Sequence, residues 1–345
     1  MSNYKARERE YIRSIEQMDL PSNMADDLRR YIQSMSFTLA ASSRYQYLHN
    51  IVSFLNYLED PTLEDLSRLK QRDFDDYLLY LQSYENEDGK REENANVSLK
   101  RKLSALRSFF DYLSRTYEDN EKLQMAFTNA EKVILPRLPK KRFITYMDQN
   151  EVKRFREEVA TASSLSKRQQ KVHAITKERD IALTDLMLST GLRLSEIANL
   201  DVNDLDMENK NLICIRKGGF ADKVFFSDQA AESLEKYLAV REHLLDEDSS
   251  PSDKKALFLS TRHKRMTDRT IRVMIEKYAG PAVPQKKITP HKLRATYATN
   301  LYTQTRDIHA VATALGHSSV NTTKEYYAHV DESIKQENRN KVFLP

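Results

Sequence analysis

The 345-residue sequence has little cysteine, little glycine and no long apolar run. Its single cysteine, Cys214, excludes an intramolecular disulfide and a multi-cysteine zinc site, which favours a reducing compartment. No apolar run approaches the roughly 18–20 residues that a membrane span needs, and the charged N-terminus lacks the apolar core of a signal peptide. These absences predict a cytoplasmic protein without a membrane partner.

The six glycines of the chain and the spacing of its apolar residues predict a mainly α-helical fold with a small antiparallel β-sheet. In residues 43–59, Leu48, Ile51 and Leu55 recur every three or four positions, as on one face of an amphipathic helix. Residues 98–115 repeat this pattern. We therefore predict a bundle of helices in the first half of the chain.

The net charge of +4 is too small to indicate a nucleic-acid partner unless the basic residues cluster. The helix predicted over residues 98–115 carries Lys100, Arg101 and Arg107 away from its apolar stripe. On an isolated helix such a face is usually only solvated. It becomes a candidate DNA-binding face if the second half of the chain acts on DNA.

Two prolines and the basic run Lys140, Lys141 and Arg142 interrupt the helical pattern in the middle of the chain. We predict a helical domain over residues 1–135, a basic linker over 136–148 and a second domain over 149–345. A basic linker is commonly a plain tether, but it also suits a clamp that closes around a DNA duplex.

The second domain is predicted to be mixed. We expect a helix, a polar loop, a second helix ending at Thr190 and Gly191, a β-hairpin around Gly218 and Gly219, a third strand and further helices. These elements are predicted over residues 149–161, 163–180, 181–189, 211–226, 256–260 and beyond 267.

Short strings in this half carry basic or proton-donating residues and a pair of tyrosines. They are TGLRLSE around Arg193, RKGG around Lys217, HKLRAT with His291 and Arg294, and LGHSSVNTTKEYYAHV with His317, Tyr326 and Tyr327. Each string alone is commonplace. Together they lack the carboxylate cluster or cysteine pair of a metal site, but they suit a phosphodiester, because arginines match the negative charge of its transition state.

The order Arg, Lys, His-x-x-Arg, His and Tyr resembles the tyrosine recombinase (phage integrase) family, of the Xer-like and Cre-like kind. The resemblance runs from about residue 149 to the end, and the first half is similar in helical make-up and size to the core-binding domain of that family. It implies that Arg193 and Arg294 clamp the scissile phosphate. It also implies that Lys217 protonates the leaving 5′ oxygen and that His291 assists proton transfer.

The same resemblance implies that His317 donates a hydrogen bond to a non-bridging oxygen and that Glu196 orients the pocket. The nucleophile is one of two adjacent tyrosines. Tyr326 lies nine residues after His317 and Tyr327 ten, and both spacings occur in the family. Since Tyr327 begins the Tyr-x-His string that commonly marks the nucleophile, we predict Tyr327, with Tyr326 as the alternative.

The family resemblance implies a site-specific recombinase that cuts and rejoins DNA through a 3′-phosphotyrosyl intermediate and a Holliday junction, without metal or cofactor. The partners would be double-stranded DNA with paired inverted half-sites and further copies of the chain, as a dimer on each site and a tetramer in the synapse. Chromosome-dimer resolution, integration or excision, and inversion remain open as roles. The alternatives are a type IB-like topoisomerase and a non-catalytic DNA-binding protein of the same fold.

Overall fold

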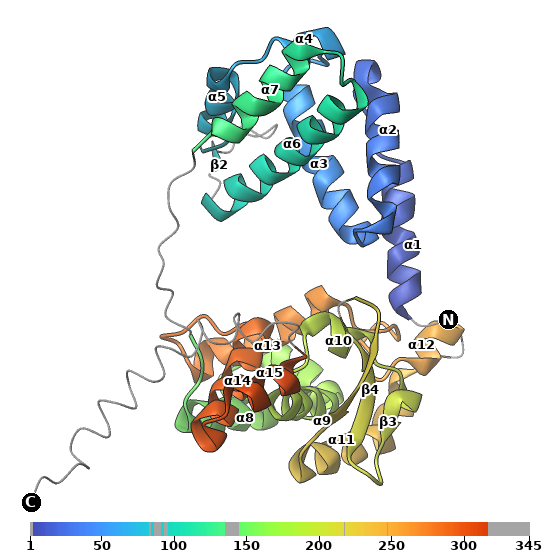
Figure 1. Ribbon diagram of the computed structural model, residues 1–345. Helices are drawn as coiled ribbons and strands as arrows, with labels where there is room; N and C mark the ends of the chain where they lie inside the picture. The colour runs from blue at the N-terminus through green and yellow to red at the C-terminus, as the bar shows by residue number, and fades with distance from the viewer. Residues whose placement is uncertain are drawn as a thin grey trace, which may run out of the picture. The chain divides into compact units, whose positions relative to one another are not determined.

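The computed structural model describes residues 3–82, 84–85, 91–92, 96–134, 145–216, 218–246 and 248–316 (Figure 1). The chain forms two compact units, Met1–Lys141 and Arg142–Pro345. Most of the predicted linker, residues 136–148, lies outside the described residues, so the predicted domain limits stay a prediction. No helix in these ranges is long and apolar enough to cross a membrane.

The first unit is a bundle of α-helices with two short 3-10 turns and a small antiparallel strand pair (Figure 1). Its elements are α1 (Asn3–Glu16), η1 (Ser22–Met24), α2 (Ala25–Ser34), η2 (Met35–Phe37), α3 (Ala41–Tyr57), α4 (Leu63–Ser67), α5 (Gln71–Gln82), β1 (Tyr84–Glu85), β2 (Arg91–Glu92), α6 (Asn96–Thr116) and α7 (Glu121–Lys132). The helices predicted over residues 43–59 and 98–115 correspond to α3 and α6.

The core of this unit forms where the apolar stripes of α3 and α6 meet those of α5 and α7. Leu48, Ile51 and Leu55 of α3 are at most 1% exposed, which confirms the stripe predicted from their spacing. Aromatic rings fill the space between the helices, and the ring centroid of Phe54 lies 5.6 Å from that of Phe74. Burial of this apolar surface is the main force that holds the bundle together.

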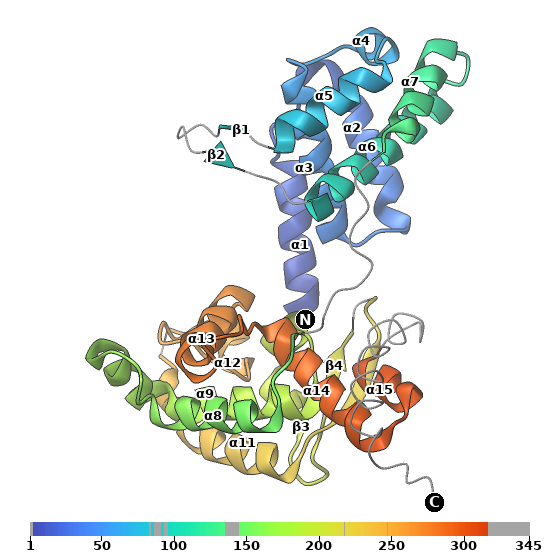
Figure 2. The same ribbon diagram turned by 90° about the vertical axis from the view of Figure 1, so that its left-hand side faces the viewer.

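The second unit packs its helices against a small sheet. Its elements are α8 (Gln149–Thr161), α9 (Lys167–Thr190), α10 (Leu194–Asn199), η3 (Val202–Asp204), β3 (Leu205–Asp206), β4 (Asn211–Ile215), β5 (Ala221–Phe225), α11 (Asp228–Arg241), η4 (Glu242–Leu244), α12 (Pro251–Lys255), α13 (Asp268–Ala282), α14 (Pro290–Thr305) and α15 (Ile308–Leu315). The long helix α9 lies between α8 and α11 and also contacts α14 (Figure 2).

The prediction of a polar loop over residues 163–180 is wrong, because α9 begins at Lys167 and continues to Thr190. Ser166 caps the helix, and its side chain accepts a hydrogen bond from the backbone N–H of Gln169. His173, Thr176 and Asp180 are buried polar residues of this helix. Their hydrogen bonds compensate for burial, so the N-terminal half of α9 contacts the core through polar residues, while most of its other residues are exposed.

The hairpin predicted around Gly218 and Gly219 is confirmed as β4 paired antiparallel with β5. The prediction of a third strand over residues 256–260 is wrong, since that segment forms only an isolated bridge between Ala256 and Asp201 and another between Leu259 and Arg265. The third strand is β3, which pairs with β4. Four apolar residues in a row, Ala256 to Leu259, thus form a buried connection instead of a strand.

Gly191 ends α9 in the left-handed conformation, with φ of 60°. A Cβ at this position would lie 2.3 Å from the ring of Tyr297 on α14. Both the backbone conformation and the close approach of α14 therefore require glycine here. The contact fixes the end of α9, and the start of α10 after it, against α14.

We predict that Gly191→Ala destabilises the protein, because the left-handed conformation alone costs an L-residue about 1–2 kcal/mol and Tyr297 must also move. Gly280→Ala is the matched control, since a Cβ at Gly280 meets no atom within 4 Å. Thermal unfolding of the full chain measures both variants. Equal unfolding temperatures for the two would contradict the packing described.

Candidate active site

The site is built around the carboxylate of Glu196, which is 4% exposed on the short helix α10. Arg193 stands at the start of this helix. Its backbone N–H donates to Oε2 of Glu196 at 2.7 Å, and its Nη1 donates to Oε1 at 2.8 Å. This pair of contacts fixes the Arg193 side chain, which remains 31% exposed and is therefore accessible to a ligand.

Arg294 reaches the same carboxylate from α14. Its Nη1 donates to the carbonyl of Gly191 at 2.6 Å and its Nη2 to the carbonyl of Leu315 at 2.6 Å. The same Nη1 lies 4.0 Å from Oε2 of Glu196. The structure thus brings together Arg193, Arg294 and Glu196, which the sequence predicted as parts of one site although up to 101 positions separate them.

His291 lies one turn before Arg294 in the first turn of α14, with its side chain exposed. Desolvation by the surrounding protein lowers the pKa of its imidazole, and the charges of Lys292, Arg294 and Arg193 lower it further. The imidazole is therefore mainly neutral at pH 7. In this state one ring nitrogen carries a proton and can donate it, and the other can accept one.

Arg216 is a member of this cluster that sequence reasoning missed. Its guanidinium is 1% exposed at the end of β4 and donates from Nη1 to Oε2 of Glu196 at 3.0 Å and from Nε to Asp222 of β5 at 2.8 Å. Burial lowers the pKa of Arg216, but the hydrogen bond to Asp222 and the neighbouring negative charges outweigh it, so the pKa lies above its usual value. The only signal in the sequence was its place directly before Lys217.

Several predicted site residues lie outside the described residues. These are the candidate acid, the second histidine, both candidate nucleophiles and the basic run of the linker: Lys217, His317, Tyr326, Tyr327, Lys140, Lys141 and Arg142. Their predicted roles stay predictions. Two of these residues directly follow described ones in sequence: Lys217 follows Arg216, and His317 follows Gly316.

The predicted DNA-binding residues of the first unit differ from one another. Lys100 and Arg101 of α6 are exposed. Arg107 is half-buried and donates to the carbonyls of Ala130, at 3.1 Å from Nε, and of Val133, at 2.9 Å from Nη2. Arg107 therefore stabilises the end of α7, whereas Lys100 and Arg101 are accessible to a ligand.

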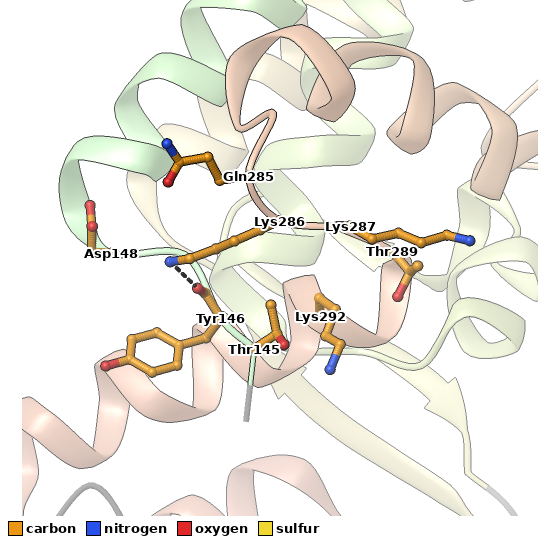
Figure 3. A pocket seen from close by; sticks show the side chains of 8 residues that line it. All are labelled: Thr145, Tyr146, Asp148, Gln285, Lys286, Lys287, Thr289 and Lys292. Atoms are coloured by element: carbon orange, nitrogen blue, oxygen red, sulfur yellow. Dashed lines mark hydrogen bonds between the residues drawn. The ribbon is translucent and has the colours of Figure 1, made fainter. Parts of the chain in front are cut away.

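A pocket of about 640 Å³ opens beside the start of α14, and three of its eight lining residues are lysines (Figure 3). It is lined by Thr145, Tyr146, Asp148, Gln285, Lys286, Lys287, Thr289 and Lys292. Lys286 donates to the carbonyl of Tyr146 at 3.0 Å and to the carboxylate of Glu151 at 2.6 Å, whereas Lys287 extends in the opposite direction (Figure 3). The pocket therefore offers positive charge next to His291.

The described cluster has a surplus of positive charge. Arg193, Arg216 and Arg294 carry three positive charges, against two negative charges on Glu196 and Asp222. A phosphodiester would supply the missing negative charge, and preorganised guanidinium groups stabilise the additional charge that develops when its phosphorus is attacked. Among the described residues no group of His, Cys, Asp and Glu side chains is arranged to hold a metal ion.

Comparison with known proteins identifies the class. The phage integrase family matches residues 145–333, and the phage integrase N-terminal SAM-like domain matches residues 26–116. The chain therefore belongs to the phage integrase family, that is, to the tyrosine recombinases. It is 30% identical over 338 residues to tyrosine recombinase XerS of Streptococcus thermophilus, covering 91% of this chain and 93% of that protein.

Solved structures show the same fold. The XerH site-specific recombinase, in a post-cleavage complex with a palindromic difH substrate, is 16% identical and superimposes with a TM-score of 0.65 over 95% of this chain and 99% of that one. The Tn1549 transposon integrase, in complex with circular intermediate DNA, is 18% identical, with a TM-score of 0.58 over 91% of this chain and 99% of that one. The predicted family and fold class are confirmed.

We predict that the imidazole of His291 titrates below its usual pKa of 6.5 and that Lys292→Gln raises the midpoint, because it removes a neighbouring positive charge. NMR titration of the histidine ring signals measures both. The exposed Lys236→Gln on α11 serves as the control and should leave the midpoint unchanged.

The lowered pKa of His291 also makes the free energy of unfolding depend on pH. Because His291 binds a proton more weakly in the folded chain than in the unfolded one, its contribution to stability decreases as the pH falls below about 6.5. His291→Gln should remove this part of the acid sensitivity. A His291 midpoint above 6.5 would contradict both expectations.

Proposed function

We propose that this chain is a site-specific DNA recombinase that cuts a DNA strand with a tyrosine and rejoins it through a 3′-phosphotyrosyl intermediate. The observation that carries the proposal is the pair Arg193 and Arg294, held on one buried carboxylate in the domain that matches the phage integrase family. Relatives support DNA as the substrate, since XerH is bound to its difH site and the Tn1549 integrase to circular intermediate DNA.

In the proposed reaction the phenol of Tyr327, or of Tyr326, attacks the scissile phosphorus and the 5′ oxygen leaves. Arg193 and Arg294 donate to the non-bridging oxygens, where negative charge accumulates. Lys217 gives its proton to the leaving oxygen. The phosphotyrosyl bond keeps the energy of the broken bond, so rejoining needs no nucleotide cofactor or metal ion.

His291 and His317 complete the proposed site. The lowered pKa of His291 keeps its imidazole neutral before the reaction, so that a ring nitrogen accepts the phenolic proton as the oxygen attacks and the ring becomes an imidazolium. His317 donates a hydrogen bond to a non-bridging oxygen. Glu196 does not touch the DNA and acts by holding Arg193.

The proposed assembly is a dimer on each site with inverted half-sites, and a tetramer when two sites meet and exchange strands through a Holliday junction. This part of the proposal follows from family membership, as does the choice among chromosome-dimer resolution, integration or excision, and inversion. The cytoplasmic location predicted from the sequence belongs to the same proposal.

The proposal is tested by recovering covalent protein–DNA adducts from cells that express the chain and sequencing the attached DNA. A recombinase should give adducts at a few sites with inverted half-sites. Adducts spread over the genome, with relaxation of plasmids that lack any such site, would indicate a topoisomerase. Absence of adducts would indicate a DNA-binding protein without the reaction.

We predict that Tyr327→Phe abolishes the covalent adduct on a nicked suicide substrate, whereas Tyr326→Phe retains it. Side chains of adjacent residues point in different directions from the backbone, so we expect one phosphate to meet only one of the two phenols. Gel analysis of the adduct measures both variants. An adduct that survives in Tyr327→Phe and disappears in Tyr326→Phe would reverse the assignment.

We also propose that the lysine-lined pocket binds a DNA phosphate next to the scissile one. Lys287→Ala should therefore lower the steepness with which DNA affinity falls with salt by roughly 0.9 in the log–log slope, the value for one phosphate contact. The control is Lys236→Ala, because Lys236 is exposed on α11 and pairs with Glu232 at 2.6 Å. Equal changes of slope in the two variants would argue against a phosphate in the pocket.

A further inference from the structure

Arg216 is almost completely buried, although nothing in the proposed reaction assigns it a role. Its side chain is 1% exposed and makes hydrogen bonds in three directions. Nη1 donates to Glu196, Nε donates to Asp222, and Nη2 donates to the carbonyl of Ala314 at the end of α15, at 3.3 Å. A single guanidinium therefore connects β4, β5, α10 and α15.

The contact with Glu196 decides how that carboxylate holds Arg193. Oε2 of Glu196 accepts from Arg216 and from the backbone N–H of Arg193, while Oε1 accepts from the Arg193 side chain. Arg216 thus fixes one oxygen of the carboxylate, so that the other points at the guanidinium of Arg193. It also balances the buried negative charge of Glu196, whose other charged partners among the described residues are Arg193 and Arg294.

The backbone around Arg216 fits this role. Its N–H donates to the carbonyl of Phe220 at 2.9 Å, which closes the turn of the hairpin. At the other side, a Cβ on Gly316 would lie 2.8 Å from Nε of Arg216, so only glycine lets the end of α15 approach the guanidinium this closely. In sequence, Lys217 follows Arg216 and His317 follows Gly316.

We propose that Arg216 is a positioning residue for DNA cleavage, which acts by holding the Glu196 carboxylate in the orientation that aims Arg193 at the scissile phosphate. The proposal rests on the proposed function, because the cleavage step is its readout. Arg216 itself touches no reacting atom.

The test variant is Arg216→Lys. It keeps the positive charge but loses the planar guanidinium, which donates hydrogen bonds to Glu196, Asp222 and Ala314 at the same time. Binding of the DNA site should stay within about threefold of the wild type. Single-turnover formation of the covalent adduct should fall by about 100-fold, the effect expected when a stabilising group is displaced by about 1 Å. Asp222→Asn, which weakens one hydrogen-bond partner of Arg216 at a position that is 35% exposed, should cause a smaller loss of adduct formation.

The chain offers a matched control in Arg241 of α11, which is 3% exposed and donates to the backbone carbonyls of Lys254 and Ala256. Arg241→Lys removes a comparably buried guanidinium from the same unit, and none of the hydrogen bonds given above for Arg241 involves Glu196. It should lower the unfolding temperature like Arg216→Lys, but the molecules that remain folded should cleave at the wild-type rate.

Modified substrates separate a loss of positioning from a general loss of fold. A methylphosphonate at the scissile position is neutral, so its transition state needs less help from Arg193, and the defect of Arg216→Lys should shrink at least tenfold on it. A 5′-bridging phosphorothiolate has a leaving group that needs no proton from Lys217. It should not restore cleavage by Arg216→Lys.

The inference is overturned if Arg216→Lys cleaves like the wild type, if Arg241→Lys loses as much activity, or if the defect is the same on phosphate and methylphosphonate. Rescue by the phosphorothiolate would also overturn it, because Arg216 would then act through Lys217. If the wild-type chain forms no adduct, the proposed function fails and the role of Arg216 with it. An adduct with the wild type but no defect in Arg216→Lys rejects the inference alone.

Discussion

The carboxylate of Glu196 is the point on which the arrangement of the second unit depends. A buried carboxylate is costly unless its oxygens are paired, and here hydrogen bonds from Arg193 and Arg216 pair them. These partners come from different elements, so satisfying one charge requires that α10 and the hairpin meet at one place. With Arg294 of α14 at 4.0 Å, the same requirement gathers three arginines around one carboxylate.

This constraint links the stability of the unit to its chemistry. Gly191 lets α14 approach the end of α9, and Arg294 then bonds the carbonyl of Gly191 and the carbonyl of Leu315. The helix ends therefore supply partners for the guanidinium, which is held in place before any DNA arrives. Such preorganisation is what electrostatic stabilisation of a transition state requires, since no reorientation is then needed during the reaction.

The two halves of the chain illustrate which parts of a fold can be predicted from sequence. The stripes of α3 and α6 were predictable, because their apolar residues recur with the helical period and one face meets one core. The C-terminal part of α9 was predicted as a helix over residues 181–189, but its N-terminal half was missed, since that half faces the core through polar residues such as Thr176 and Asp180. The Asp180 carboxylate accepts a hydrogen bond from Tyr278, which lies 98 positions further along the chain, and no local pattern reveals such a partner.

The candidate site divides in the same way. The sequence by itself predicted the chemistry, because the types and order of Arg193, His291 and Arg294 match what a phosphodiester needs and resemble what the family carries. Only the tertiary structure decided that Arg216 belongs to the site. Its importance lies in simultaneous contacts with Glu196, Asp222 and the end of α15, and a set of contacts between remote segments leaves no period or spacing in the sequence.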